Sequence, residues 1–209
     1  MLRITRFFSG KSFLPLIVCL LCGLIVGWAD SWESVQKSAG KVQSLQAEFI
    51  QKKHLEILSE PLVSKGIFFF KAPDSLRLEY NSPVRSVTLV HHDSYKRYRQ
   101  GENGLVSDSD AQLSVMRHVL QEISLWLQGN FRKSPNFAAS LDPGQKIVLT
   151  PKKEAIKSAI DRIELHLSQQ PGIMKKVTIY EKNNSYTEII FRDISLNGPL
   201  QDSLFRKLQ

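Results

Sequence analysis

Cysteine is almost absent from this 209-residue sequence, and its two copies, Cys19 and Cys22, both lie near the start. If residues 1–29 are removed, the remaining chain has no thiol, so it contains no disulfide and no metal site built from cysteine. Such a chain depends on its hydrophobic core for stability, and 209 residues are enough for one domain with a sizeable core.

The sequence also lacks the short motifs of common enzyme classes. It contains no Gly-x-Ser-x-Gly, no phosphate-binding loop and no His-Glu-x-x-His. Its five histidines are scattered, and the adjacent His91 and His92 would point to opposite faces of a strand, which is poor geometry for binding one metal ion. We therefore expect no catalytic residues and no metal site.

Acidic residues are missing from the first 29 positions, which carry three cations. An uncharged apolar run from Phe13 to Val26 follows these cations, and Gly27-Trp28-Ala29 has the small-x-small pattern of a cleavage site. We predict that residues 1–29 are a secretory signal peptide and that residues 30–209 form one domain in the bacterial periplasm. An uncleaved membrane anchor is the alternative, because the apolar run is near the short end for a membrane span.

The net charge of +8 is modest for a chain of this length. It fits a soluble surface, or attraction to anionic membranes or acidic partners. Only the run Lys96-Arg97-Tyr98-Arg99 would favour nucleic acid, and we expect no nucleic-acid partner. A solvated strand edge that discourages aggregation is the simpler interpretation of this run, and docking of an acidic partner is the alternative.

The most informative stretch runs over residues 64–80. Ile67 to Phe70 is an apolar run, and Pro73-Asp74-Ser75 is typical of a turn. Residues 76–80 then alternate between apolar and charged side chains, which predicts a hairpin with one apolar face and with Arg77 on the solvated face. The three consecutive phenylalanines of this hairpin need cover, either from another part of the chain or from a bound apolar ligand.

Period-two alternation and turn residues predict further strands. They cover residues 45–58, 84–91, 94–100, 146–150, 160–168, 172–181 and 185–193. Helical periodicity predicts one helix over residues 32–45 and another over 110–128, with Ser109 and Gln112 as a capping box and Gly129 as its end. Sequential strands joined by short turns build a meander, which would twist and curl into an open sheet or incomplete barrel.

The concave face of such a sheet would receive one set of apolar side chains, and the second helix would face them. From the strands this candidate set is Phe49, Phe68, Phe70, Leu76, Leu78, Tyr80 and Leu89, and from the helix it is Met116, Ile123 and Trp126. Either the helices fill the hollow and make an ordinary core, or they lie over it as a lid and leave room for an apolar guest. Composition alone favours the ordinary core.

Three stretches of the chain form recognisable patterns in order. They are Leu45-Gln-Ala-Glu-Phe49-Ile-Gln51, the hairpin Ser64-x-Gly66-x-Phe68-x-Phe70-Lys71-x-Pro73-x-x-Leu76-Arg77-x-Glu79-Tyr80, and Phe191-x-Asp-Ile-x-Leu-Asn197-x-Pro199-Leu200-x-Asp-Ser-Leu-Phe205. Together they resemble the LolA family, the periplasmic carriers that ferry lipoproteins to the outer membrane. The likeness covers essentially the whole chain after the predicted signal peptide.

This resemblance implies an α+β, mainly β fold: an unclosed antiparallel β-barrel, or half-barrel, with a helical lid. It implies that the candidate set forms a hydrophobic cavity for lipoprotein acyl chains, without enzymatic activity or a cofactor. The partners it implies are an inner-membrane lipoprotein-releasing ABC transporter, which delivers cargo, and an outer-membrane receptor lipoprotein, which takes it. We expect the carrier itself to be a monomer.

One position departs from the family pattern. The family often has an arginine immediately before the hairpin proline, where it bonds to the lid helices and helps hold the hollow shut. Here that position is Ala72. The departure keeps open a carrier for another acyl lipid or glycolipid. A lipid-sensing regulatory domain is a second alternative, because related periplasmic half-barrel domains bind lipid or lipoprotein signals and regulate a membrane-bound partner.

Overall fold

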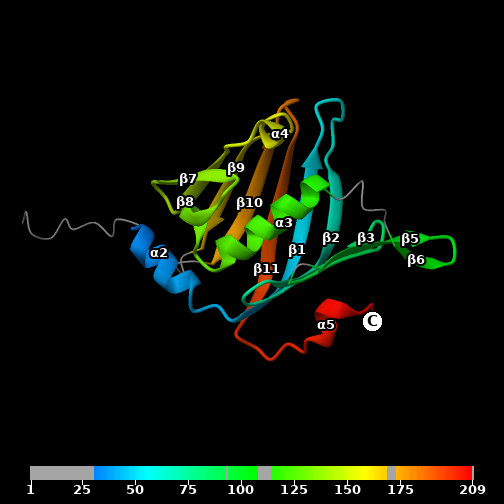
Figure 1. Cartoon of the computed structure of the whole chain (residues 1–209). Coiled ribbons are helices and arrows are strands. Elements are labelled where there is room, and N and C mark those ends of the chain that lie inside the picture. Colours follow the sequence, from blue (N-terminus) through cyan, green and yellow to red (C-terminus); the bar gives the residue numbers. More distant parts are fainter. Residues whose placement is uncertain (1–30, 93, 108–113, 169–172, 209) are drawn as a thin grey trace, which may run out of the picture.

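The computed structural model describes residues 31–92, 94–107, 114–168 and 173–208 (Figure 1). For residues 114–119 and 121 it describes the backbone alone. The predicted signal peptide, and the predicted capping box at Ser109 and Gln112, lie outside the described residues.

The described chain forms one 11-stranded sheet. The strands are β1 (Ser44–His54), β2 (Leu62–Lys71), β3 (Ser75–Ser82), β4 (Ser86–His91), β5 (Ser94–Gly101), β6 (Gly104–Ser107), β7 (Phe137–Asp142), β8 (Lys146–Pro151), β9 (Ile160–Leu167), β10 (Met174–Glu181) and β11 (Tyr186–Leu196). The helical segments are α2 (Trp32–Ala39), α3 (Ser114–Leu127), the 3₁₀ turn η2 (Phe131–Lys133), α4 (Glu154–Lys157) and α5 (Ser203–Arg206). The predicted class, mainly β with an unclosed antiparallel sheet, is confirmed.

The sheet is two meanders joined along one seam. Its order is β6-β5-β4-β3-β2-β1-β11-β10-β9-β8-β7, so the first and last strands of the chain pair with each other at its centre. Asn197 ends β11 with a positive φ of 58°, a conformation that asparagine tolerates. Its Oδ1 accepts a hydrogen bond from the Gln43 backbone at 2.7 Å, and its own N–H donates to Ser44 O at 2.8 Å. The motif residue Asn197 therefore helps set the register of the β1–β11 seam.

The sequence analysis did not predict two of the strands, β6 and β7, and both lie at the edges of the sheet. β6 has only four residues, and β7 follows directly on the loop that contains Pro135. An edge strand pairs on one side only, so its burial pattern alternates weakly. The first helix is also shorter than expected, because α2 ends at Ala39, its C-cap Gly40 follows, and the chain has entered β1 by Ser44.

α3 crosses the concave face of the sheet and lies over β10, β11 and β1 (Figure 1). On the β7–β9 side of this face, the side chains pack into a solid core. Phe137, Ile147, Leu149, Ile163 and Leu165 are each at most 1% exposed there. The same core extends under the C-terminal end of α3, where Trp126 meets the Phe137 ring at a centroid distance of 6.3 Å.

The opposite, convex face is also partly covered. The short C-terminal helix α5 contacts β3 and β4 there, and its Phe205 is 1% exposed (Figure 1). Arg77 lies on this face and is only 2% exposed. Its guanidinium donates to Leu204 O and Lys207 O, each at 3.1 Å, and to the Glu79 carboxylate at 2.7 Å. The prediction of a solvated Arg77 was wrong, because α5 returns to cover this side of the hairpin.

Candidate functional site

A hollow of about 620 Å³ lies between the concave face of the sheet and α3. That volume is within the range of about 300–1,000 Å³ typical of small-molecule sites. Side chains of β1, β2, β3, β4, β5, β10, β11 and α3 line it. The apolar wall residues include Ala47, Phe49, Phe68, Leu78, Leu120, Ile123, Trp126, Leu127, Ile173, Met174, Val177, Ile179, Ile189, Phe191 and Ile194.

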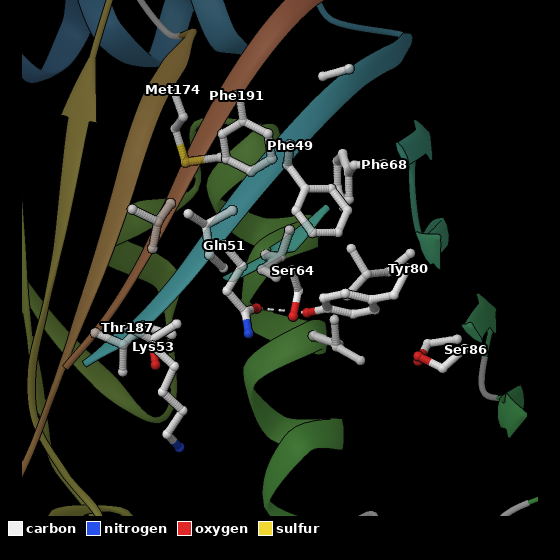
Figure 2. A pocket seen from close by; sticks show the side chains of 18 of the residues that line it. Phe49, Gln51, Lys53, Ser64, Phe68, Tyr80, Ser86, Met174, Thr187 and Phe191 are labelled. Atoms are coloured by element: carbon white, nitrogen blue, oxygen red, sulfur yellow. Dashed lines mark hydrogen bonds between the residues drawn. The ribbon is translucent and has the colours of Figure 1, made fainter. Parts of the chain in front are cut away.

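The inward-facing side chains of β1 change in polarity along the strand. Leu45, Ala47 and Phe49 face the hollow first, and Gln51 and Lys53 follow on the same face. Figure 2 shows the Phe49 ring inside the hollow, with the Gln51 and Lys53 side chains further along the same strand.

The strands on one side of β1 repeat this change in the same direction. On β11 the hollow-lining residues run from Phe191 through Ile189 to Thr187, and Lys53 lies opposite Thr187 in the register. On β10 they run from Val177 through Ile179 to Glu181. Each strand is apolar near the closed end of the hollow and polar near its mouth.

On the other side of β1, β2 follows the same rule and changes from Phe68 to Ser64. We call the polar residues beyond Phe49 on these strands the polar end of the hollow: Gln51, Lys53, Ser64, Glu181 and Thr187. The hollow-lining residues of β4 and β5 are Thr88 opposite Arg97 and Ser86 opposite Arg99, level with Leu78 and Tyr80 in the register.

A glycine makes room for the aromatic ring at the centre of the wall. Phe49 lies opposite Gly66 in the register, and Gly66 in turn lies opposite Tyr80. A Cβ on Gly66 would approach Phe49 Cζ to 2.7 Å and the backbone oxygen of Glu79 to 2.0 Å, so only glycine fits. The vacant position lets the Phe49 and Tyr80 rings meet edge to face at a centroid distance of 5.1 Å.

Tyr80 lies at the boundary between the apolar wall and the polar end. Its hydroxyl donates a hydrogen bond to Gln51 Oε1 at 2.7 Å (Figure 2). Burial disfavours the phenolate and raises the pKa of Tyr80 to about 12, although the nearby positive charge of Arg97 acts in the opposite direction. Tyr80 is therefore a neutral hydrogen-bond donor at any physiological pH.

Four charged residues line the hollow in the part of the chain that the structure describes: Lys53, Arg97, Arg99 and Glu181. Lys53 Nζ lies 3.3 Å from Glu181 Oε1, so these two charges neutralise each other on the β1–β10 side. Arg97 and Arg99 line the hollow from β5.

Six of the ten residues predicted for the cavity line this hollow: Phe49, Phe68, Leu78, Tyr80, Ile123 and Trp126. Phe70 and Leu76 lie on the same face, opposite each other in the register, but are 0% exposed in the core beyond the closed end. The backbone of Met116 belongs to α3, and its side chain is outside the described part of the structure.

The placement of Leu89 in the cavity was wrong. Leu89 lies opposite Arg77 in the register, on the convex face, where it lines a groove with Phe205 of α5. Leu89 is 2% exposed because α5 covers it. The alternating apolar residues of β4 therefore lie on the convex face of that strand. The residues of β4 that line the hollow are instead the small polar Ser86 and Thr88.

Sequence reasoning missed the C-terminal half of the wall. Val177 and Ile179 on β10, and Ile189 and Phe191 on β11, line the hollow as fully as the N-terminal hairpin does. Period-two alternation predicted these strands, but no local signal showed that they pair with β1 rather than extend a meander away from it. The β1–β11 seam brings both halves around one space.

The lid helix contacts the hairpin through a glutamine. Gln128 Nε2, just after α3, donates to Pro73 O at 2.5 Å and to Ser124 O at 3.0 Å. Ala72, which stands where the family often has arginine, packs against the core, and its N–H donates to Gln43 O. The hydrogen bond between helix and hairpin therefore comes from the helix side in this chain.

The described residues include no group of three or more histidine, cysteine or acidic side chains that could hold a metal ion. None of the helices among these residues is sufficiently long and apolar to cross a membrane.

Several solved structures are similar to this chain at low sequence identity. A putative outer membrane lipoprotein-sorting protein domain from Vibrio parahaemolyticus is 10% identical, with a TM-score of 0.46 over 83% of this chain and 94% of the other. A LolA superfamily protein from Nitrosomonas europaea is 10% identical, with a TM-score of 0.43 over 84% and 96%. The MucA/MucB complex from Pseudomonas aeruginosa gives 14% identity and a TM-score of 0.46, over 83% of this chain and 59% of that one.

A comparison with curated proteins finds no match to the sequence. The family comparison does: residues 40–207 match the family described as outer membrane lipoprotein carrier protein LolA. The match includes every strand and α3, and thus all the elements that surround the hollow. The chain therefore belongs to the LolA family.

Proposed function

We propose that this protein is a periplasmic carrier that binds the acyl chains of lipoproteins in the hollow and transfers them from the inner to the outer membrane. The observation that carries the proposal is the hollow itself, about 620 Å³ in volume, with an apolar wall and a polar mouth. An acylated molecule has the matching shape and polarity, because its chains are apolar and its head group is polar.

The energetics of acyl chains explain why a carrier is needed. Each methylene gains about 0.8 kcal/mol on leaving water, so a chain of about 15 methylenes gains about 12 kcal/mol. Such a chain does not cross an aqueous compartment unprotected. A wall of large apolar side chains, such as Phe49, Phe68 and Phe191, replaces water around the chain without directional bonds.

Release requires that the acyl chain can give up its contacts with the wall for contacts with another site. Apolar contacts are non-directional, so an acyl chain that leaves the hollow breaks no specific bond with the wall. A downstream site that buries the chain better then takes it without any chemical step. The lid helix α3 presents Ile123 and Trp126 to the chain, and its hydrogen bond to the hairpin at Gln128 is one contact that opening would break.

The proposed route has a partner at each end. We propose that an inner-membrane lipoprotein-releasing ABC transporter delivers the cargo and that an outer-membrane receptor lipoprotein accepts it. The carrier acts as a monomer after removal of the signal peptide, residues 1–29, and residues 30–209 form the carrier domain. The proposal includes no catalytic step.

Two neighbouring residues on β11 provide a matched test. Ile189 lines the hollow, whereas Ile190, paired with Ile50, lies on the other face of the same strand, and both are partly exposed. Purified Ile189→Glu and Ile190→Glu variants are titrated with a diacylated lipopeptide that carries a fluorophore on its peptide. We expect Ile189→Glu to weaken binding by at least tenfold, because a carboxylate in the hollow opposes an acyl chain. Ile190→Glu should bind like the wild type.

Equal binding by both variants, or no binding by the wild-type protein, would contradict the proposal. A photo-reactive amino acid at Phe68, which lines the hollow, identifies the cargo in cells. We expect it to crosslink to acylated proteins. Exclusive crosslinking to unacylated proteins would count against an acyl-chain carrier.

A further inference from the structure

We propose that the tip of the β1–β2 hairpin, residues 55–63, inserts into the surface of a lipid bilayer and so holds the mouth of the hollow against the membrane. We call these residues the hairpin tip. The inference rests on the proposed function, because it assumes that an acyl chain passes between the hollow and a membrane. It adds a docking surface that lies outside the hollow.

The hairpin tip carries a cluster of exposed apolar side chains. Seven large apolar residues are exposed in the described part of the chain, and four of them belong to the tip: Ile57, Leu58, Leu62 and Val63. Ile57 is 88% exposed, and Leu58 beside it is 44% exposed. Single exposed apolar residues are normal on a protein surface, whereas a group of them marks a place where another molecule binds.

The apolar side chains of the tip lie on both faces of the hairpin. Leu62 is opposite Lys53 in the register and so shares the concave face with it, whereas Val63 is opposite Lys52 on the convex face. Leu62 is 53% exposed and Val63 is 43% exposed. A protein that packs on a hairpin covers one of its faces, whereas the apolar region of a bilayer surrounds an inserted tip. Exposure on both faces therefore favours a lipid surface.

The hairpin tip lies at the mouth of the hollow. Ile57 follows Lys53 of the polar end by four residues, a span of at most about 14 Å. In Figure 1 the β1–β2 connection lies at the same end of the sheet as the turn between β10 and β11. Glu56 Oε1 accepts a hydrogen bond from Asn184 Nδ2 of that turn at 3.3 Å. Insertion of the tip would therefore bring the mouth to the membrane surface, where an acyl chain enters or leaves without crossing water.

The charges beside the tip suit the head-group region of a membrane. Lys52 and Lys65 lie on the same face as Val63, and Lys65 is exposed. Cations beside a shallowly inserted apolar segment bind lipid phosphates, and the net charge of +8 adds a general attraction to anionic lipid. Because the tip also carries the exposed Glu60, we expect apolar insertion to supply most of the affinity.

The experiment measures flotation of the protein with lipid vesicles. The protein is the mature form proposed above, residues 30–209, and the vesicles contain phosphatidylcholine alone or with about a quarter phosphatidylglycerol. We expect the wild-type protein to float with both, and severalfold more with the anionic vesicles at low salt. Ile57→Ser/Leu58→Ser should lower partitioning into both at least about tenfold, because two apolar side chains no longer leave water.

A matched control replaces an exposed apolar residue elsewhere. Val106 is 51% exposed on β6, an edge strand of the sheet, and Val106→Ser should float like the wild type. Hydrogen exchange locates the contact in the wild-type protein. We expect vesicles to slow exchange of the amides of residues 55–61 and to leave the amides of α5, on the convex face, unchanged. Protection of α5 without protection of the tip would contradict the inference.

A transfer assay connects the tip to the carrier. The wild-type protein and the Ile57→Ser/Leu58→Ser variant are loaded with a fluorescent diacylated lipopeptide and mixed with vesicles. We expect both to bind the lipopeptide equally well in solution, because neither Ile57 nor Leu58 lines the hollow. The variant should release it to the vesicles at least about tenfold more slowly, in proportion to its weaker docking.

The outcomes separate the two proposals. If the wild-type protein does not float, or if the tip variant floats equally well, the inference is wrong and the acyl-chain carrier stands. If the tip variant slows transfer only to a protein acceptor, the tip contacts a protein and the inference is again wrong. If the lipopeptide does not bind but flotation still depends on the tip, the proposed function fails and the bilayer contact is confirmed.

Discussion

The Tyr80 hydroxyl donates a hydrogen bond to Gln51 Oε1 at 2.7 Å and so joins β3 to β1 across the intervening strand β2. The bond lies where the apolar wall of the hollow gives way to its polar end. On one side of it the Phe49 ring packs against Tyr80, and on the other side Lys53 and Thr187 face the mouth (Figure 2). A neutral phenol at this boundary offers an apolar ring to one side and a polar atom to the other.

Ionisation of Tyr80 gives the first prediction. Its pKa is raised to about 12 in the folded protein, against 10 for an ordinary tyrosine, because burial disfavours the phenolate. The folded state therefore binds more protons than the unfolded state between pH 10 and 12, and stability falls as pH rises through this range. A spectrophotometric titration at the phenolate band, with Tyr80→Phe subtracted, should show a step near pH 12. If the difference between the wild-type and Tyr80→Phe titrations shows a step at the pKa of an ordinary tyrosine, the burial argument is contradicted.

Gly66 gives a prediction about packing. Gly66→Ala places a Cβ 2.7 Å from the Phe49 ring and 2.0 Å from a backbone oxygen of β3, so the strands or the ring must move. We expect a loss of about 1–3 kcal/mol in the free energy of unfolding, measured by urea denaturation. Gly198→Ala is the control, because its nearest neighbouring atom would be 3.9 Å away. A loss equal to that of the control would show that the wall tolerates the extra methyl group.

Arg77 gives a prediction about the C-terminal helix. Arg77→Ala leaves Leu204 O and Lys207 O without this donor and removes the guanidinium from the mostly buried Glu79 carboxylate. Breaking a buried ion pair on one side typically costs about 3–5 kcal/mol. We expect α5 to become accessible to hydrogen exchange and to protease.

Arg85→Ala is the control for Arg77. Its side chain is half-exposed and 3.5 Å from the same carboxylate, so its loss should cost at most about 1 kcal/mol. Slow exchange throughout α5 in the Arg77→Ala variant would show that the remaining contacts, such as buried Phe205 and the Arg206–His91 hydrogen bond, suffice to hold the helix on the sheet.

Gln128 gives a prediction about the lid. Gln128→Ala removes the hydrogen bonds to Pro73 O and Ser124 O, and hence one contact between the helix and the hairpin. We expect faster amide exchange in the last turn of α3 and a loss of about 0.5–1.5 kcal/mol in stability. Gln100→Ala is the matched control, because its side chain is exposed and donates to the neighbouring Gly101 O within the same strand. Unchanged exchange in α3 would mean that Trp126 and Leu127 hold this end of the helix by packing.

Much of this protein was readable along the chain. Alternation in residues 64–80 predicted the central hairpin, and helical spacing predicted α3 and its apolar face. Both follow from local rules, because the side-chain period of a strand or helix is fixed by backbone geometry. The same rules placed Phe49, Phe68, Leu78 and Tyr80 on one face, and all four line the hollow.

Only the tertiary structure decided whether the face that these side chains share is concave or convex. It also decided which segment covers the opposite face of the sheet. Alternation shows which residues share a face but not whether the face is concave, and on β4 the apolar face proved to be the convex one. Leu89 and Arg77 are both buried because α5, from the far end of the chain, packs over them. The shared polarity gradient arises in the same way: it exists only because β11 pairs with β1 and aligns strands more than 100 residues apart. Local sequence fixes the period of each strand, whereas the register between distant strands depends on the free energy of the whole assembled sheet.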